Sequence, residues 1–236
     1  MATYGDLKIS TINGGALAGF RNAIINGNFG INQRVVSGTV SLAAGAYGHD
    51  RWKAGASGCT YTFATSENVT TITISAGSLI QVVEGLNLMT GTYSLSWQGT
   101  AQGKIGAGSY GNSGITGSVT GGTNLNIEFG TGTLSLVQLE KGTVATPFEF
   151  RSIGQEEILC KRYYQGLSTT SGICYDSGGV QWSYSLKATM RSSPTVVFSS
   201  GGVQNRIRRT SSGAYSTANS AIVYLCDTNS SQFFFY

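Results

Sequence analysis

Acid–base chemistry in this chain would depend on very few side chains. His49 is the only histidine among 236 residues, so a Ser-His-Asp or Cys-His arrangement would have to use it. Its neighbours Gly48 and Asp50 do not form the turn that exposes a nucleophile at the end of a strand. The sequence therefore predicts that His49 is a solvated residue in a turn and takes no part in catalysis.

Glycoside hydrolysis needs only two carboxylates, so the 11 acidic residues are the other candidates for catalysis. Glu140 and Glu149 lie in a motif that resembles a structural framework, and Glu156 and Glu157 begin a predicted helix. No repeat or spacing brings two of the other acids together, so we predict that the protein is not an enzyme. A small polysaccharide depolymerase is a weaker alternative. The other acids are Asp6, Asp50, Glu67, Glu84, Glu128, Asp176 and Asp227.

The chain lacks the usual patterns that hold metals or nucleotides. Its cysteines have no Cys-x-x-Cys spacing, which argues against a zinc site, and we expect free buried thiols in preference to disulfides. Phosphate-binding and EF-hand motifs are also missing, so we predict no cofactor and no metal. Calcium bound by backbone carbonyls of Gly- and Asn-rich loops stays open. The cysteines are Cys59, Cys160, Cys174 and Cys226.

The composition indicates a turn-rich β protein. Charged residues make up 11% of the chain, against about 25% in average globular proteins, and 34 residues are glycine. The net charge of +4 is small, and its one dense basic run, RIRR at 206–209, is too short for a nucleic-acid footprint. Without an apolar leader or a membrane-spanning run, we expect a soluble protein with no export signal and no membrane insertion.

Alternating apolar and polar residues predict short strands. In TYSLSWQG, Tyr93, Leu95 and Trp97 alternate with polar residues, which is typical of a strand with one buried face. Several such strands favour two packed antiparallel sheets, and we predict a jelly-roll-like β-sandwich over residues 22–151 with Trp52 in its core. Its other strands are expected at 61–63, 69–74, 79–83, 125–129 and 134–140.

The stretch 134–165 joins this sandwich to a smaller C-terminal β domain, predicted over residues 167–236. Pro147 favours an extended segment, in which Phe148 and Phe150 alternate with charged residues. This alternation predicts that the two rings lie on one side of the segment.

A short helix is expected to link the two domains. Ser152 and Gln155 match a capping box, in which each side chain satisfies a backbone N–H of the first helical turn. The helix is predicted over residues 152–166. We expect it to dock through Leu159 and Tyr163.

Three motifs along the chain resemble a known group of proteins. The first lies in NAIINGNFGINQR, the second is DRW, and the third is QLEKGTVATPFEFR followed by CKRYYQ. Together they are similar to bacteriophage tail fibre and related virion appendage proteins, several of which have a carbohydrate-binding-like jelly-roll domain. The matching residues are Ile25, Asn26, Gly27, Phe29, Asn32, Gln33, Arg34, Asp50, Arg51, Trp52, Leu139, Glu140, Gly142, Thr146, Pro147, Phe148, Glu149, Arg151, Cys160, Arg162, Tyr163 and Tyr164.

The resemblance implies a structural protein of a phage virion, assembled in the host cytoplasm. A tail fibre or tip protein would attach to polysaccharide on the bacterial surface, often as a homotrimer. Residues 1–21 would then be an arm that binds other virion proteins, with a disordered terminus or an edge strand as the alternative. A head fibre, collar or decoration protein, which binds only virion proteins, is the alternative function.

A glycan-binding fibre needs exposed aromatic rings that stack on sugars and polar side chains that bond their hydroxyl groups. We select one aromatic residue from the Gly- and Ser-rich region 99–123 and three residues from the loop-rich C-terminal stretch. An ordinary surface role is the alternative for each. The candidates are Tyr110, Arg206, Arg208 and Tyr215.

The last four residues form an apolar end that would be costly to expose to water. We therefore expect their rings to be buried against their own domain or in an oligomer interface. These residues are Phe233, Phe234, Phe235 and Tyr236.

Overall fold

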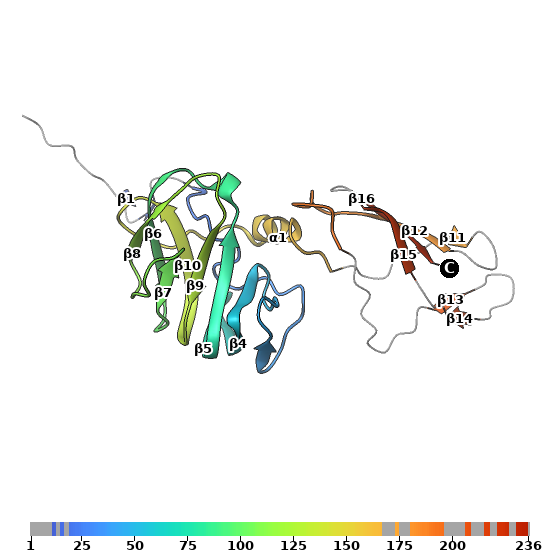
Figure 1. Ribbon diagram of the computed structural model, residues 1–236, viewed down its shortest axis with the longest axis horizontal. Coiled ribbons are helices and arrows are strands. Elements are labelled where there is room, and N and C mark those ends of the chain that lie inside the picture. The colour runs from blue at the N-terminus through green and yellow to red at the C-terminus, as the bar shows by residue number, and fades with distance from the viewer. Residues whose placement is uncertain are drawn as a thin grey trace, which may run out of the picture. The chain divides into compact units, whose positions relative to one another are not determined.

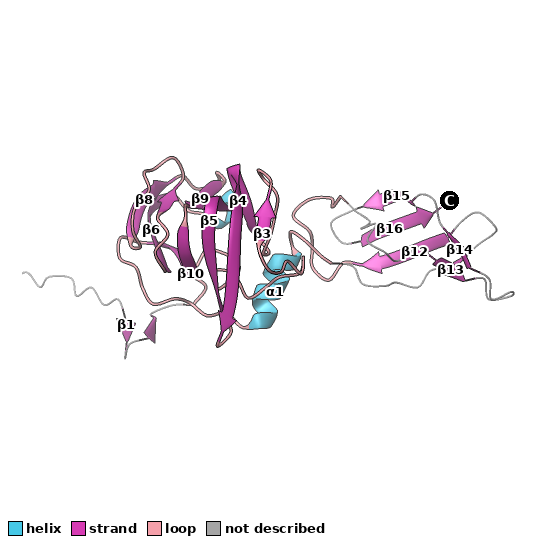
Figure 2. Ribbon diagram, turned by 90° about the horizontal axis from the view of Figure 1, so that it is seen from below, coloured by secondary structure: helices cyan, strands magenta, loops and turns pink. Residues whose placement is uncertain are grey.

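The computed structural model describes residues 11–12, 15–16, 19–166, 173–174, 180–195, 206–208, 215–217, 221–226 and 230–235. The chain divides into a first unit, Met1–Cys160, and a second unit, Lys161–Tyr236. Strands dominate both units in Figures 1 and 2, and every pairing of the described strands is antiparallel. The predicted all-β fold is confirmed.

The two longest strands of the first unit, β4 and β5, form an antiparallel hairpin and lie side by side in Figure 1. The turn between them has positive φ at Glu67 and Asn68 (49° and 64°), which suits the twist of a tight hairpin. The segments 69–74 and 79–83, expected as two strands, are parts of one strand, β5. A bulge in β4 lies opposite the Gly- and Ser-containing residues between them, so the pairing continues past these residues. The first half of the sheet contains β3 (Val40–Leu42), β4 (Trp52–Ser66), β5 (Val69–Val83), β7 (Gly103–Ile105) and β9 (Leu125–Phe129).

Strand β10 (Gly132–Lys141) joins these strands to β6 (Gly91–Gln98) and β8 (Ile115–Val119), so that all eight strands form one sheet. Its first residues pair with β5, and after a register shift between Ser135 and Gln138 it pairs with β6. Leu136, inside the shift, has a φ of 50°, as a bulge allows. The other edge of β6 pairs with β8, so the Gly- and Ser-rich region contains strands.

One hydrophobic core contains side chains from both halves of this sheet. Trp52 is fully buried, as predicted, and its ring lies 4.7 Å from that of Phe29. Its indole N–H donates a 2.9 Å hydrogen bond to the carbonyl of Asn26, which satisfies the ring's one polar group. Trp97 packs edge-on against Phe129 at 5.0 Å. Trp52 belongs to the second motif, and its partners Asn26 and Phe29 belong to the first, so these two motifs pack against each other in the core.

The predicted helix is present as α1 (Ile153–Lys161), shorter than the expected 152–166. The hydroxyl of Ser152 accepts a 3.4 Å hydrogen bond from the Gln155 N–H, as the capping box predicts. The predicted docking face is wrong, because the buried helical residues are Glu156 and Cys160. Glu156 faces inward since it accepts a hydrogen bond from the backbone of Asn26.

The second unit contains a four-stranded sheet and a separate strand pair. In the sheet, ordered β11-β12-β16-β15, strand β16 lies between two neighbours, and β13 pairs with β14. The strands among the described residues of this unit agree with the β character predicted for the C-terminal domain. The elements are β11 (Ile173–Cys174), β12 (Val180–Ser185), β13 (Arg206–Arg208), β14 (Tyr215–Thr217), β15 (Ala221–Cys226) and β16 (Ser230–Phe235).

Within the predicted arm, β1 (Thr11–Ile12) pairs with β2 (Gly15–Ala16). A 3-10 turn, η1 (Gly85–Asn87), follows β5 in the first unit.

Candidate ligand-binding site

The extended segment between Pro147 and α1 is held in place by its charged side chains. Glu149 accepts hydrogen bonds from the backbone N–H groups of Phe20 and of Asn22, the latter at 2.8 Å. Arg151 donates to the carbonyl of Ile24 at 3.0 Å and forms an ion pair with Glu156 at 3.1 Å. Because alternate residues of an extended chain point in opposite directions, these contacts leave the neighbouring phenylalanine rings on the other side.

The two rings form an aromatic wall. Phe148 and Phe150 have centroids 4.8 Å apart at an interplanar angle of 80°, the edge-to-face geometry that aromatic pairs favour. Phe148 is half-buried, whereas Phe150 is 63% exposed. Phe150 therefore presents aromatic surface to any ligand at this position.

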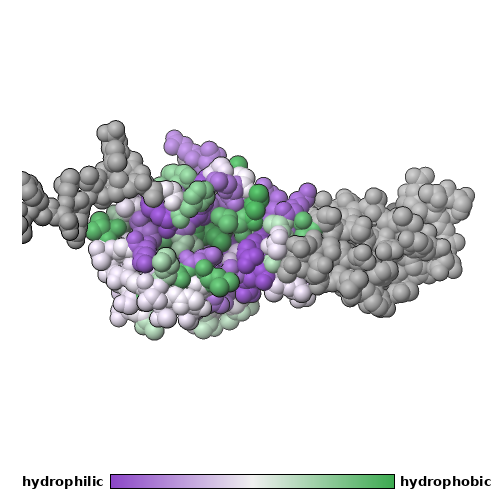
Figure 3. All heavy atoms as spheres, turned by 90° about the horizontal axis from the view of Figure 1, so that it is seen from above, coloured by the Kyte–Doolittle hydropathy of each residue, from purple (hydrophilic) through white to green (hydrophobic). Residues whose placement is uncertain are grey.

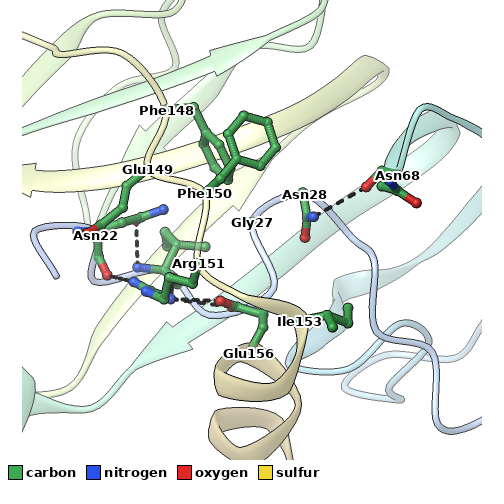
Figure 4. A pocket seen from close by; sticks show the side chains of 11 residues that line it. Asn22, Gly27, Asn28, Asn68, Phe148, Glu149, Phe150, Arg151, Ile153 and Glu156 are labelled. Atoms are coloured by element: carbon green, nitrogen blue, oxygen red, sulfur yellow. Dashed lines mark hydrogen bonds and ion pairs between the residues drawn. The ribbon is translucent and has the colours of Figure 1, made fainter. Parts of the chain in front are cut away.

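Two asparagine side chains lie across from this wall. Asn28 belongs to the first motif, and Asn68 is in the turn between β4 and β5, as Figure 4 shows. The Asn28 carbonyl accepts a 3.0 Å hydrogen bond from the Thr70 N–H, and its side-chain amide donates to the Asn68 carbonyl at 3.4 Å. These bonds hold the hairpin turn beside the first motif.

An open pocket of about 360 Å³ lies between the aromatic wall and the asparagines. Its volume is near the lower end of the roughly 300–1,000 Å³ of small-molecule sites. Stacking on a ring and hydrogen bonding to carboxamides are the interactions that it offers a ligand. The lining residues are Asn22, Ile24, Gly27, Asn28, Asn68, Phe148, Glu149, Phe150, Arg151, Ile153 and Glu156.

Tyr110, the predicted glycan contact in the first unit, lies away from this pocket. It is 42% exposed, and Lys104 Nζ lies 4.8 Å from its ring centroid, over one face. Lys104 also pairs with Glu128 at 2.9 Å. Burial alone would raise the pKa of Glu128, but hydrogen bonds from Ser78, Lys104 and Tyr110 outweigh it and lower that pKa. Tyr110 is thus part of a polar cluster on the outer face of β9.

The other predicted contacts lie in the second unit. The pairing of β13 with β14 sets Arg208 opposite Tyr215 and Arg206 opposite Thr217, so two of the three candidates are direct cross-strand neighbours. A role for them in glycan binding stays a prediction.

The apolar end of the chain forms the second half of β16. Phe233, Phe234 and Phe235 pair on one side with β12 and on the other with β15. Tyr236 lies outside the described residues. The backbone of these phenylalanines is therefore in the interior of a sheet, and the predicted oligomer interface stays a prediction.

His49 is not solvated, as the sequence suggested, but buried. It is 2% exposed, its Nδ1 lies 3.0 Å from the hydroxyl of Tyr61, and its ring packs edge-on against Phe63 at 4.6 Å. Both partners come from β4, whose alternation turns apolar side chains toward the loop that contains His49. Burial lowers the pKa of His49 from 6.5 to about 4, so the imidazole is neutral at pH 7.

This buried imidazole is expected to make the first unit less stable as the pH falls from 6.5 toward 4. In that range the unfolded chain takes up a proton on His49 whereas the folded chain resists it, so acid favours unfolding. The loss reaches about 3 kcal/mol near pH 4. Urea titrations at about pH 7 and about pH 4.5 measure it, and His49→Gln should show a shallower pH dependence. An identical dependence in both proteins would contradict the assignment.

Within the described ranges, no group of three or more His, Cys, Asp or Glu side chains is placed to hold a metal ion. Cys59 and Cys160 are free and buried, in agreement with the predicted thiols. In the same part of the chain, no helix is long and apolar enough to cross a membrane.

Apolar side chains reach the surface of the first unit in several places, and in Figure 3 green patches are bordered by purple, polar side chains. Phe150 and Ile153, at 63% and 66% exposure, are the exposed apolar residues that also line the pocket. Sequence reasoning assigned Phe148, Glu149 and Arg151 to the framework and missed the pocket. The signal was the pair of phenylalanines after Pro147, in a segment without strand pairing.

No family model, no curated protein and no solved structure matches this chain. The resemblance to phage appendage proteins stays a prediction.

Proposed function

We propose that this chain is a non-catalytic binding protein that recognises glycan through the pocket beside Phe150. In the setting that the three motifs suggest, it is a structural protein of a phage virion, a tail fibre or tip that attaches to bacterial surface polysaccharide. Assembly as a homotrimer, attached to other virion proteins through the N-terminal arm, would multiply individually weak contacts.

One observation supports the glycan pocket above all others: Phe150 leaves 63% of its surface exposed at the mouth of a pocket. An aromatic face stacks on the C–H groups of a sugar ring, and the exposed carboxamide of Asn68, which Asn28 holds in place, can bond its polar groups. The ion pair between Arg151 and Glu156 also lines the pocket. Its side chains are 8% and 10% exposed, so the pair fixes the position of the segment that contains Phe150. The arrangement favours non-covalent recognition.

Phe150→Ala is expected to weaken binding to host cells or isolated surface glycan about tenfold, because the variant loses the stacking surface. Since Phe150 is largely exposed, the melting temperature should change little. The measurement is a titration of fluorescently labelled protein on cells, followed by competition with phage for adsorption. Ile158→Ala is the matched control, because Ile158 is 57% exposed but does not line the pocket. Equal binding by both variants would exclude the pocket.

A second function, as a head fibre, collar or decoration protein, is favoured by the apolar loop after β5. Leu86 and Met89 there are 88% and 67% exposed, which suits contact with another protein. If the wild-type protein binds phage particles lacking it but never binds cells, this function replaces attachment.

A further inference from the structure

We infer that the pocket takes a neutral sugar with an acetamido group, an N-acetylhexosamine, in preference to an acidic sugar. The inference rests on the proposed function and specifies the chemical class of its ligand. Three features of the lining support it: its charge, the Asn68 carboxamide and its apolar surface.

The lining residues offer an acidic sugar no positive charge that lacks a negative partner. Arg151 is the only Lys or Arg among them, and its Nη1 lies 3.1 Å from Glu156 and 3.0 Å from the Ile24 carbonyl. Its side chain is 8% exposed, so its charge is neutralised and turned away from solvent. Glu149 adds a second carboxylate, which leaves the lining negative. A uronic acid, sialic acid or phosphorylated sugar would meet repulsion there, whereas a neutral sugar would not.

The Asn68 carboxamide can bond an acetamido group. Asn68 is exposed in the hairpin turn, and Asn28 is half-buried beside it. The Asn28 side chain is already engaged, because its oxygen accepts a 3.2 Å hydrogen bond from the Gly30 N–H and its amide donates to the Asn68 carbonyl. An acetamido group is a trans amide with its N–H and C=O on opposite sides, so the Asn68 carboxamide can make one hydrogen bond to it. The acetamido oxygen extends beyond the position of a hydroxyl oxygen, so this hydrogen bond favours the acetylated sugar.

Apolar surface in the same pocket suits the acetamido methyl group. Ile153 is 66% exposed and lines the pocket together with Phe150. Burying one methyl group against them favours the acetylated sugar by about fourfold. Together with the hydrogen bond to Asn68, we expect a preference of about tenfold over the sugar that has a hydroxyl at that position.

Calorimetric titration of the full chain tests the inference with four probes: N-acetylglucosamine, N-acetylgalactosamine, glucose and glucuronic acid. At least one N-acetylhexosamine should bind about tenfold more tightly than glucose, with glucuronic acid weakest. Glucuronic acid that binds as tightly as the N-acetylhexosamines would overturn the inference, as would equal binding of glucose.

Asn68→Asp keeps the shape of the side chain but replaces the amide donor with a negative charge. It should reduce the preference for N-acetylhexosamine to about twofold or less without changing the melting temperature. Asn87→Asp is the matched control, because Asn87 is exposed in η1 and does not line the pocket. An unchanged preference in Asn68→Asp would contradict the role of the Asn68 carboxamide.

Two kinds of failure can be told apart. If every sugar binds, Phe150→Ala abolishes the binding and no acetamido preference exists, the ligand class is wrong and the glycan site stands. If no sugar and no host glycan bind, the proposed function fails and the inference with it.

Discussion

Replacement of Arg151 by alanine is expected to lower the free energy of unfolding of the first unit by about 3 to 5 kcal/mol. The guanidinium pairs with Glu156 at 3.1 Å, and both side chains are about nine-tenths buried. It also donates to the carbonyls of Asn22 and Ile24. The variant leaves a carboxylate buried without its partner and two carbonyls without their donor, which is far more costly than loss of a surface pair.

Urea titration followed by tryptophan fluorescence measures this effect. Trp52 and Trp97 lie in the first unit and Trp182 in the second, so a Trp182→Phe background restricts the signal to the first unit. The matched control is Lys104→Ala, because the pair Lys104–Glu128 is only partly buried, at 25% and 18% exposure. Its loss should cost at most about 1 kcal/mol. Similar losses in both variants would contradict the assigned role of Arg151.

Gly27→Ala is expected to destabilise the first unit by about 3 kcal/mol or more. A Cβ atom at this position would overlap the carbonyl oxygen of Val137 and lie 3.2 Å from the ring of Phe148. The backbone there cannot easily yield, because the Gly27 carbonyl accepts a 2.8 Å hydrogen bond from the N–H of Val137, which is itself fully buried. The same shift would distort the pocket, so glycan binding should fall as well.

A helical glycine provides the control for this change. Gly154 lies in the first turn of α1, and an added Cβ would meet no atom within 4 Å. Gly154→Ala should therefore leave stability unchanged or raise it by about 0.5 to 1 kcal/mol, because alanine loses less backbone entropy in a helix. The two melting curves should move in opposite directions. A loss of stability in Gly154→Ala as large as that in Gly27→Ala would contradict the steric explanation.

The pocket was only partly predictable from the sequence. Alternation after Pro147 predicts that the rings of Phe148 and Phe150 share a side, and the structure places them 4.8 Å apart. Asn28 and Asn68 are separated by 40 residues, and no local pattern indicates that they meet. They come together because the β4–β5 hairpin turn bonds the backbone of the first motif.

The sequence by itself determined the fold class, the buried faces of several strands and the start of α1. Alternation and the capping box depend on near neighbours in the chain, and the scarcity of charge is a property of the whole composition, so none of them needs the tertiary structure. Only the tertiary structure decided that His49 is buried and that α1 docks through Glu156. Both outcomes depend on partners distant in sequence, Tyr61 of β4 and the backbone of Asn26, which local periodicity cannot identify.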